Sequence, residues 1–231
     1  MTRITIACLD MAGTTVRDDG TVLAAFSAAV GQAGLASGTP EHDRAMEIVH
    51  AMMGNSKADV FRRILGDEDA AARANQAFED HYAAAVRAGQ VSAMPGAAET
   101  ITGLRAAGVQ VCLLTGFSPT TRDAILDALG WRPLIDLALS PADAGRGRPW
   151  PDLPLTALLR LGGQAVRDLA VLGDTPSDVT SGMRAGAGLV AGVLTGRATR
   201  DELKQAGAPL ILDSVADLPG HLGNRPAQTS L

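Results

Sequence analysis

The first residue that could do chemistry is Asp10, in the segment Asp10-Met11-Ala12-Gly13-Thr14-Thr15. The apolar run Ile4–Leu9 before it predicts a buried strand, and a Gly-Thr turn follows it. Because open α/β sheets bind their ligands at the carboxyl ends of their strands, Asp10 lies where a nucleophile or a metal ligand belongs. Ala12, two positions later, can act neither as an acid nor as a base.

Three later segments carry groups that suit a phosphoryl group and a metal ion. Thr115 and Gly116 offer a hydroxyl and a backbone amide that can hold a phosphoryl oxygen. Arg148 supplies a fixed positive charge, and the carboxylates of Asp174 and Asp178 suit one hard cation such as Mg²⁺. Alone, each segment is typical of a turn, a surface loop or a helix cap. Their joint occurrence, each after an apolar run, is what favours a functional site.

A lysine stands out by its rarity. The chain has eighteen arginines and only two lysines, Lys57 and Lys204. A primary amine with an adjustable pKa can form a Schiff base with a carbonyl, which a guanidinium cannot. Lys57, in Met53-Gly54-Asn55-Ser56-Lys57, is the candidate for this chemistry, whereas Lys204 lies in a charged helical pattern that predicts a solvated face.

These residues must be positioned by strands and helices that alternate along most of the chain, a pattern that indicates an α/β fold with a doubly wound parallel sheet. Apolar runs predict strands at Ile4–Leu9, Val109–Thr115, Leu137–Ser140, Leu169–Gly173, Leu189–Leu194 and Pro209–Leu212. Helical patterns lie between most of them, at Ala97–Ala107, Thr120–Leu129, Leu153–Leu161 and Ser177–Ala185.

The interval from Arg17 to Met94 breaks the alternation. It contains amphipathic helical patterns and no convincing strand, and Pro95-Gly96 marks the return of the α/β pattern. We therefore expect a core domain formed by residues 1–16 and 95–231, with an all-helical domain at residues 17–94. The expected helices of this domain are Val22–Ala33, Glu41–Met52, Lys57–Leu65 and Asp69–Ala88.

Composition excludes several classes of function. A net charge of −5 and the lack of a basic run argue against a protein that binds nucleic acid through its phosphates. Cys8 and Cys112 lie in apolar runs and are expected to be reduced core residues. Without a signal segment or a bilayer-spanning run, we expect a cytoplasmic protein that does not bind a membrane.

The four motifs, in this order and with a helical insertion after the first, resemble the haloacid dehalogenase superfamily. That resemblance implies a Rossmann-like core with a type-one cap. Phosphatases of the superfamily usually read Asp-x-Asp-Gly-Thr at the first motif, whereas this chain has Ala12. Asp-x-Ala-Gly-Thr, the cap motif Met-Gly-x-x-Lys ending at Lys57, and Arg148 in place of the usual lysine together resemble phosphonoacetaldehyde hydrolase, or phosphonatase.

The resemblance implies a role for each site residue. Asp10 would attack phosphorus to give an aspartyl-phosphate, and Lys57 would form an imine with the substrate carbonyl. An enamine leaving group needs no general acid, which accounts for Ala12. Mg²⁺ would be held by Asp10, the Ala12 carbonyl and Asp174, with Asp178 orienting this shell. The substrate would contact the remaining site residues, Thr115, Gly116, Arg148, Met53, Gly54 and Phe117.

The match is incomplete: a cysteine near the start of the phosphonatase cap has no counterpart in Asp19-Gly20-Thr21-Val22, and two further positions near the substrate differ. Val60 stands where phosphonatase has a histidine, and Phe117 stands where it has a tyrosine. These departures leave open which small phosphonate is the substrate. They also keep a second hypothesis, a phosphomonoesterase in which Lys57 only binds an anion. A non-catalytic binding module is a third. The family resemblance also suggests a homodimer through the cap.

Overall fold

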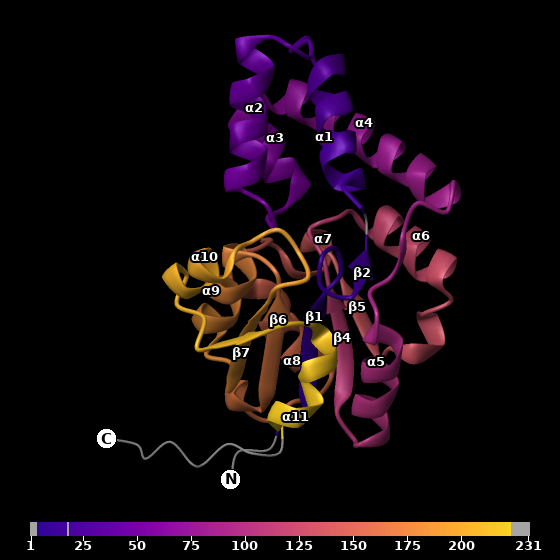
Figure 1. The fold of residues 1–231 in the computed structure, drawn as a ribbon, viewed down its shortest axis with the longest axis vertical. Coiled ribbons are helices and arrows are strands. Elements are labelled where there is room, and N and C mark those ends of the chain that lie inside the picture. Colours follow the sequence, from indigo (N-terminus) through magenta and orange to yellow (C-terminus); the bar gives the residue numbers. More distant parts are fainter. Residues whose placement is uncertain (1–3, 18, 223–231) are drawn as a thin grey trace.

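A computed structural model of the chain describes residues 4–17 and 19–222. Its centre is a parallel six-stranded sheet in the order β5-β4-β1-β6-β7-β8 (Figure 1). With β1 in the middle and later strands added on both sides, the sheet is doubly wound, which confirms the predicted fold class. The strands are β1 (Ile6–Asp10), β4 (Gln110–Leu114), β5 (Leu137–Leu139), β6 (Leu169–Gly173), β7 (Leu189–Val193) and β8 (Leu210–Leu212).

The central strands are buried on both faces, as a parallel sheet covered by helices requires. Along β1, Ala7 and Leu9 pack into one apolar cluster, and Ile6 and Cys8 pack into another on the opposite face. Cys8 and Cys112 are buried, free and level with each other on adjacent strands. The strand predictions hold because these runs are continuously apolar.

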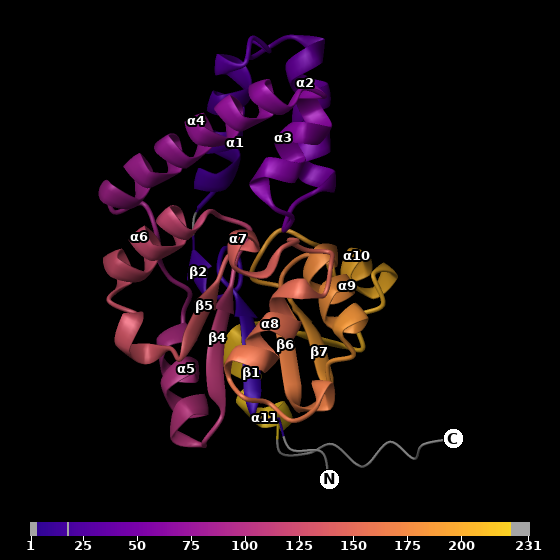
Figure 2. The ribbon, with the colours of Figure 1, turned by 180° about the vertical axis from the view of Figure 1, so that it is seen from behind.

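Helices cover both faces of the sheet. One face carries α5 (Ala97–Ala106) and α11 (Pro219–Leu222), and the other carries α8 (Asp152–Arg160), α9 (Pro176–Ala185) and α10 (Arg200–Gln205) (Figures 1 and 2). The remaining helices of the sheet-bearing part are α6 (Pro119–Leu129), α7 (Pro141–Ala144) and the short 3₁₀ turns Arg132–Leu134, Val166–Asp168 and Val215–Asp217. None of the helices in the described ranges is long and apolar enough to cross a membrane.

Four helices lie together beyond the carboxyl end of the sheet, and we call them the helical insert (Figure 1). They are α1 (Thr21–Gln32), α2 (Pro40–Ala51), α3 (Lys57–Leu65) and α4 (Glu68–Arg87). Their interior is aromatic: the side chains of Phe26, Phe61, Phe78 and Tyr82 are fully buried, and the rings of Phe26 and Phe78 lie 4.6 Å apart. Each of the four helices turns its apolar residues toward this interior, which accounts for the four amphipathic patterns in the sequence.

A two-stranded antiparallel ribbon joins the insert to the sheet. It pairs β2 (Val16–Arg17) with β3 (Ser92–Ala93). The prediction that residues 17–94 contain no strand is therefore wrong at Arg17 and at β3, because a strand of two residues is too short to leave an apolar pattern. The division into domains at residues 17 and 94 stays a prediction.

Candidate active site

Strand register brings three of the predicted residues to one edge of the sheet. Asp10 pairs with Leu114, so Thr115 follows at the same level on the neighbouring strand. On the other side, Leu9 pairs with Leu172, which places Asp174 just beyond the end of β6. Asp10, Thr115 and Asp174 are all buried. Residues far apart in the sequence therefore converge because parallel strands end together.

Asp178 is positioned by the start of α9. Thr175 is the N-cap residue, and the Asp178 carboxylate accepts hydrogen bonds from the Thr175 backbone N at 3.1 Å and Oγ1 at 2.5 Å. This reciprocal arrangement is a capping box, in which a threonine and an acidic residue satisfy the free amides of the first turn. A Cβ on Gly173 would lie 2.1 Å from Cγ of Asp178, so a glycine is needed at that position.

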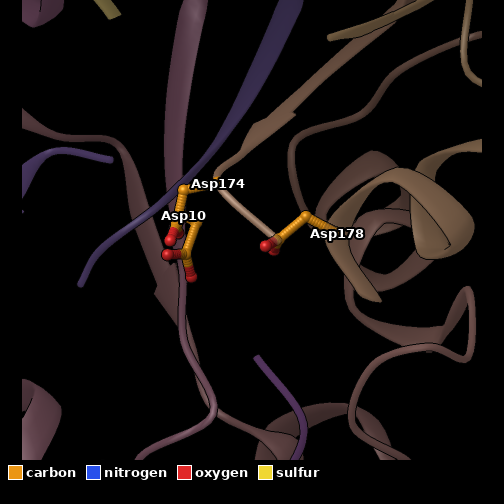
Figure 3. Close-up of side chains that lie close together, drawn as sticks. All are labelled: Asp10, Asp174 and Asp178. Carbon is orange, nitrogen blue, oxygen red and sulfur yellow. The ribbon is translucent and has the colours of Figure 1, made fainter. Parts of the chain in front are cut away.

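The three carboxylates form one buried cluster. Asp10, Asp174 and Asp178 each offer an oxygen within 4.8 Å of the others (Figure 3). Asp174 also accepts a hydrogen bond from the Arg197 backbone N at 3.1 Å. Carboxylate oxygens are the hard donors that Mg²⁺ prefers. The cluster therefore fits a magnesium ion, and Asp178, which the sequence analysis expects to orient the ligands, belongs to the same cluster.

The electrostatics of the cluster favour a bound cation. Burial raises the pKa of Asp10 to about 6, against the opposing charge of Arg148 and with a further rise from Asp178. Burial, together with Asp10 and Asp178, raises the pKa of Asp174 well above its ordinary value. Both shifts mean that nearby positive charge does not offset the cost of ionising these buried carboxyl groups. A divalent cation would supply that compensation.

Arg148 lies between the nucleophile candidate and the helix carboxylate. Its Nη1 donates to Oδ1 of Asp10 at 2.5 Å and also to Oδ1 of Asp178. Its Nε is buried and has no hydrogen-bond partner among the residues the structure places. Arg148 thus holds the Asp10 carboxylate and keeps one donor that its carboxylate partners do not use.

Lys57 reaches the same site from the helical insert. It is the first residue of α3, its side chain is buried, and its backbone N donates to the Gly116 carbonyl at 3.3 Å. Its Nζ lies 4.9 Å from the ring centroid of Phe117 and 5.8 Å from that of Phe26. The charge of Lys57 also acts on Asp10, whose pKa it lowers. Lys57 and Asp10 are therefore electrostatically linked across the two parts of the chain.

Two glycines allow the insert to approach the sheet so closely. A Cβ on Gly116 would lie 2.4 Å from the backbone oxygen of Asn55. Gly54 has a φ of +88°, and a Cβ there would lie 2.3 Å from Oγ1 of Thr175. Any side chain at either position would push the loop before Lys57 away from the sheet edge.

A cavity of about 710 Å³ lies between the sheet edge and the insert. All the predicted site residues line it except Asp178, which sits behind Arg148. Those lining it are Asp10, Ala12, Met53, Gly54, Lys57, Thr115, Gly116, Phe117, Arg148 and Asp174. The cavity therefore brings together the Asp10 carboxylate, the Lys57 amine and the Thr115 hydroxyl.

Sequence reasoning missed one wall of this cavity. Thr195, Gly196 and Arg197 follow β7, and Arg17 lies in β2. A Cβ on Gly196 would lie 1.8 Å from a carboxylate oxygen of Asp174, so the loop after β7 packs directly on the cluster. The available signal was topological, since a Thr-Gly pair directly after a predicted parallel strand must lie at the same sheet edge.

The two departures from the phosphonatase pattern expected near the substrate have different locations. Val60 is buried inside the insert and does not line the cavity. Phe117 does line it, and its ring packs 4.5 Å from that of Tyr82. The loss of a hydroxyl at Phe117 therefore concerns the cavity surface, whereas Val60 belongs to the packing of α3.

Comparison with protein families gives one match over most of the chain. The haloacid dehalogenase-like hydrolase family model matches residues 4–186. Among solved structures, a hydrolase from Pseudomonas syringae superposes with a TM-score of 0.81 at 25% identity, covering 94% of this chain and 97% of that one. The match spans β1, the whole insert and α9, and therefore all the predicted site residues.

Two curated relatives resemble shorter parts of the chain. A probable phosphatase, IndB, from Dickeya dadantii (strain 3937) is 31% identical over 126 residues, which are 54% of this chain and 54% of the relative. A phosphonoacetaldehyde hydrolase from Pseudomonas putida is 31% identical over 106 residues, which are 46% of this chain and 38% of the relative. The similarity thus spans about half or less of each relative's length.

Proposed function

Since the chain belongs to the haloacid dehalogenase-like hydrolases, we propose that it cleaves the carbon–phosphorus bond of phosphonoacetaldehyde or a related small 2-oxo-phosphonate. One observation carries the proposal: Lys57 and Asp10 line the same cavity, together with Ala12 at the position where an acid would otherwise stand. The similarity to the Pseudomonas putida phosphonoacetaldehyde hydrolase supports the same substrate class.

The proposed reaction begins at Lys57. Its neutral amine attacks the substrate carbonyl, water leaves, and a protonated imine forms. The Asp10 carboxylate then attacks phosphorus, and the electrons of the carbon–phosphorus bond move into a carbon–carbon double bond while the iminium nitrogen is neutralised. The resulting enamine needs no proton at the moment of bond cleavage, so Ala12 is tolerated. The enamine carbon then takes up a proton from water, which regenerates the protonated imine. Water finally hydrolyses the aspartyl-phosphate and this imine, releasing phosphate, the carbonyl product and the free amine of Lys57.

The remaining residues hold the substrate and the nucleophile. Thr115 and Gly116 would donate hydrogen bonds to phosphoryl oxygens. Arg148 would hold the Asp10 carboxylate through Nη1, and its Nε, which donates to no acceptor among the residues the structure places, would be available to the substrate. A Mg²⁺ ion held by Asp10, Asp174 and the Ala12 carbonyl would neutralise charge on the transferring phosphoryl group.

The helical insert would act as the cap of this site. Its Lys57 meets the sheet edge only when the loop at Asn55 lies against Gly116. Water excluded by that contact cannot hydrolyse the imine before phosphorus is attacked. Closure and reopening of the insert would then accompany each turnover.

A phosphomonoesterase of the same family is the second candidate. The contact of Lys57 Nζ with the Phe117 ring stabilises the protonated amine, which suits anion binding better than imine formation. The similarity to the probable phosphatase IndB agrees with this alternative. Its difficulty is Ala12, because an alkoxide leaving group needs an acid in the transition state.

Steady-state phosphate release separates the two functions. The substrates are phosphonoacetaldehyde and a panel of small phosphate monoesters, tested on the wild type, Lys57→Ala and Lys57→Arg. Lys57→Arg keeps the positive charge but cannot form an imine, so we expect it to lose phosphonate cleavage as completely as Lys57→Ala. Lys204→Arg, at the other lysine, is the matched control. Phosphate-ester turnover that Lys57→Arg retains and Lys57→Ala weakens would favour the phosphomonoesterase, in which Lys57 only binds an anion.

A further inference from the structure

The outer part of the active-site cavity carries two cations that the proposed reaction does not use. Arg197, in the loop after β7, and Arg17, in β2, both line the cavity and are exposed. No ion pair links Arg197 to any acidic residue in the described ranges, whereas the Nε of Arg17 lies 3.9 Å from Oδ1 of Asp19. The outer part therefore has an excess of positive charge.

Arg197 is fixed to the catalytic cluster through its backbone. Its N donates to Oδ2 of Asp174 at 3.1 Å, and the preceding Gly196 packs directly on the same carboxylate. Thr195, one residue earlier, donates to the Gly13 carbonyl at 2.7 Å. The start of the Arg197 side chain is thus anchored beside the phosphoryl position, while its exposed guanidinium end is not held by an ion pair.

Arg17 lines the same cavity as Lys57. It precedes α1, whose Val22 lines the cavity and whose Phe26 ring is 5.8 Å from Lys57 Nζ. A substrate that places phosphorus at Asp10 and a carbonyl carbon at Lys57 would share the cavity with both arginines. With Arg17 and Arg197 against Asp19, the outer part of the cavity has one net positive charge, which matches one carboxylate.

We propose that Arg197, assisted by Arg17, binds a carboxylate of the substrate, so that the site selects a phosphonate bearing a second anionic group. The inference rests on the proposed function for the position of the phosphoryl group. A cavity of about 710 Å³ leaves ample space beyond a two-carbon aldehyde, and an arginine binds a carboxylate through two parallel hydrogen bonds.

Equilibrium binding of unreactive ligands tests this inference without any catalytic step. The probes are 3-phosphonopropanoate and 4-phosphonobutanoate, each compared by calorimetry with the alkylphosphonate of the same carbon number, in buffer with Mg²⁺. We expect the wild type to bind each carboxylate ligand more tightly than its partner. Arg197→Gln should reduce that preference about tenfold, the effect of losing one moderate charge-assisted hydrogen bond. Arg17→Gln should reduce the preference less, because Asp19 already offsets part of the positive charge of Arg17.

Arg200→Gln is the matched control, because Arg200 lies in the same region, is exposed and pairs with Asp213 without lining the cavity. It should leave the preference unchanged, and all three variants should bind the alkylphosphonates as the wild type does. The inference is overturned if the wild type shows no preference, if Arg197→Gln keeps it, or if Arg200→Gln reduces it equally. Failure of carbon–phosphorus cleavage would leave this binding result untouched, so the two proposals fail separately.

Discussion

Glu79 joins the helical insert to the sheet-bearing part of the chain. Replacing it therefore tests directly how the two parts are held together. It lies on α4, yet its carboxylate is buried and accepts three hydrogen bonds from outside the insert. Oε1 accepts from the Ser118 backbone N at 3.1 Å, and Oε2 accepts from the Ser118 hydroxyl at 2.6 Å and from the Thr121 hydroxyl. Ser118 directly follows Phe117, so the junction borders the active-site cavity.

The expected magnitude follows from those three donors. Glu79→Ala leaves them in a buried place without their acceptor, at about 1–3 kcal/mol for each donor that finds no other partner. Both hydroxyls can rotate toward other acceptors, so we expect a total loss of about 3–5 kcal/mol in the free energy of unfolding. Glu79→Gln keeps one oxygen for the Ser118 backbone N and replaces the other with an amide NH2, from which both hydroxyls can accept after rotating. This predicts a smaller loss of about 1–2 kcal/mol.

Urea unfolding followed by far-ultraviolet circular dichroism measures both values. The control is Glu68→Gln on the same helix, where the carboxylate is exposed and pairs with Arg62 at 3.0 Å. An exposed pair of this kind contributes about 0.2–1 kcal/mol. If Glu79→Ala lowered the free energy of unfolding no more than Glu68→Gln, the inferred junction between insert and sheet would be wrong.

Three further predictions concern the site itself. Ala12→Asp restores an acid in the cavity and should raise turnover of alkyl phosphate esters by about 10²-fold or more, the usual contribution of a general acid, without raising phosphonate turnover; equal changes would refute the assigned role. Because the folded pKa of Asp10 is raised to about 6, the folded protein holds this proton more tightly than the unfolded chain, so metal-free stability should fall as pH rises from about 4 through 6. Thermal unfolding in EDTA should show this fall, and Asp10→Asn should make it shallower without abolishing it, because the pKa of buried Asp174 is raised as well; a flat wild-type profile would contradict the prediction. Gly116→Ala should abolish activity with an unchanged circular dichroism spectrum, because its Cβ meets the Asn55 oxygen, while Gly103→Ala, with open space around it, should be active.

The strands and helices were predictable because their patterns come from burial. β6 and the part of β1 before Asp10 are apolar without interruption, and only a strand covered on both faces requires that. The ribbon of β2 and β3 escaped prediction because it has two residues in each strand, of which Arg17, Ser92 and Ala93 are exposed. An exposed pair of such length leaves no periodic trace in the sequence.

The site was predictable where a motif names a residue and its neighbours, as at Asp10 and Asp174. It was not predictable where position depends on packing between distant segments. Glu79 reads as one more charge on a helix, since its neighbour Asp80 is exposed and acidic as well. Arg197 follows a strand without any motif, and only the six-stranded order brings it beside Asp174. Such residues depend on tertiary contacts that a single sequence does not encode locally.

Trapping of the Lys57 imine tests the central claim most directly. The protein is incubated with phosphonoacetaldehyde and Mg²⁺, reduced with borohydride and digested, and the lysine peptides are compared by mass spectrometry. With only two lysines in the chain, Lys204 serves as the internal control. We predict a reduced adduct on Lys57 that requires substrate, is absent from Lys204 and disappears in Lys57→Arg. An unmodified Lys57 with phosphonoacetaldehyde and with related 2-oxo-phosphonates would contradict the claim.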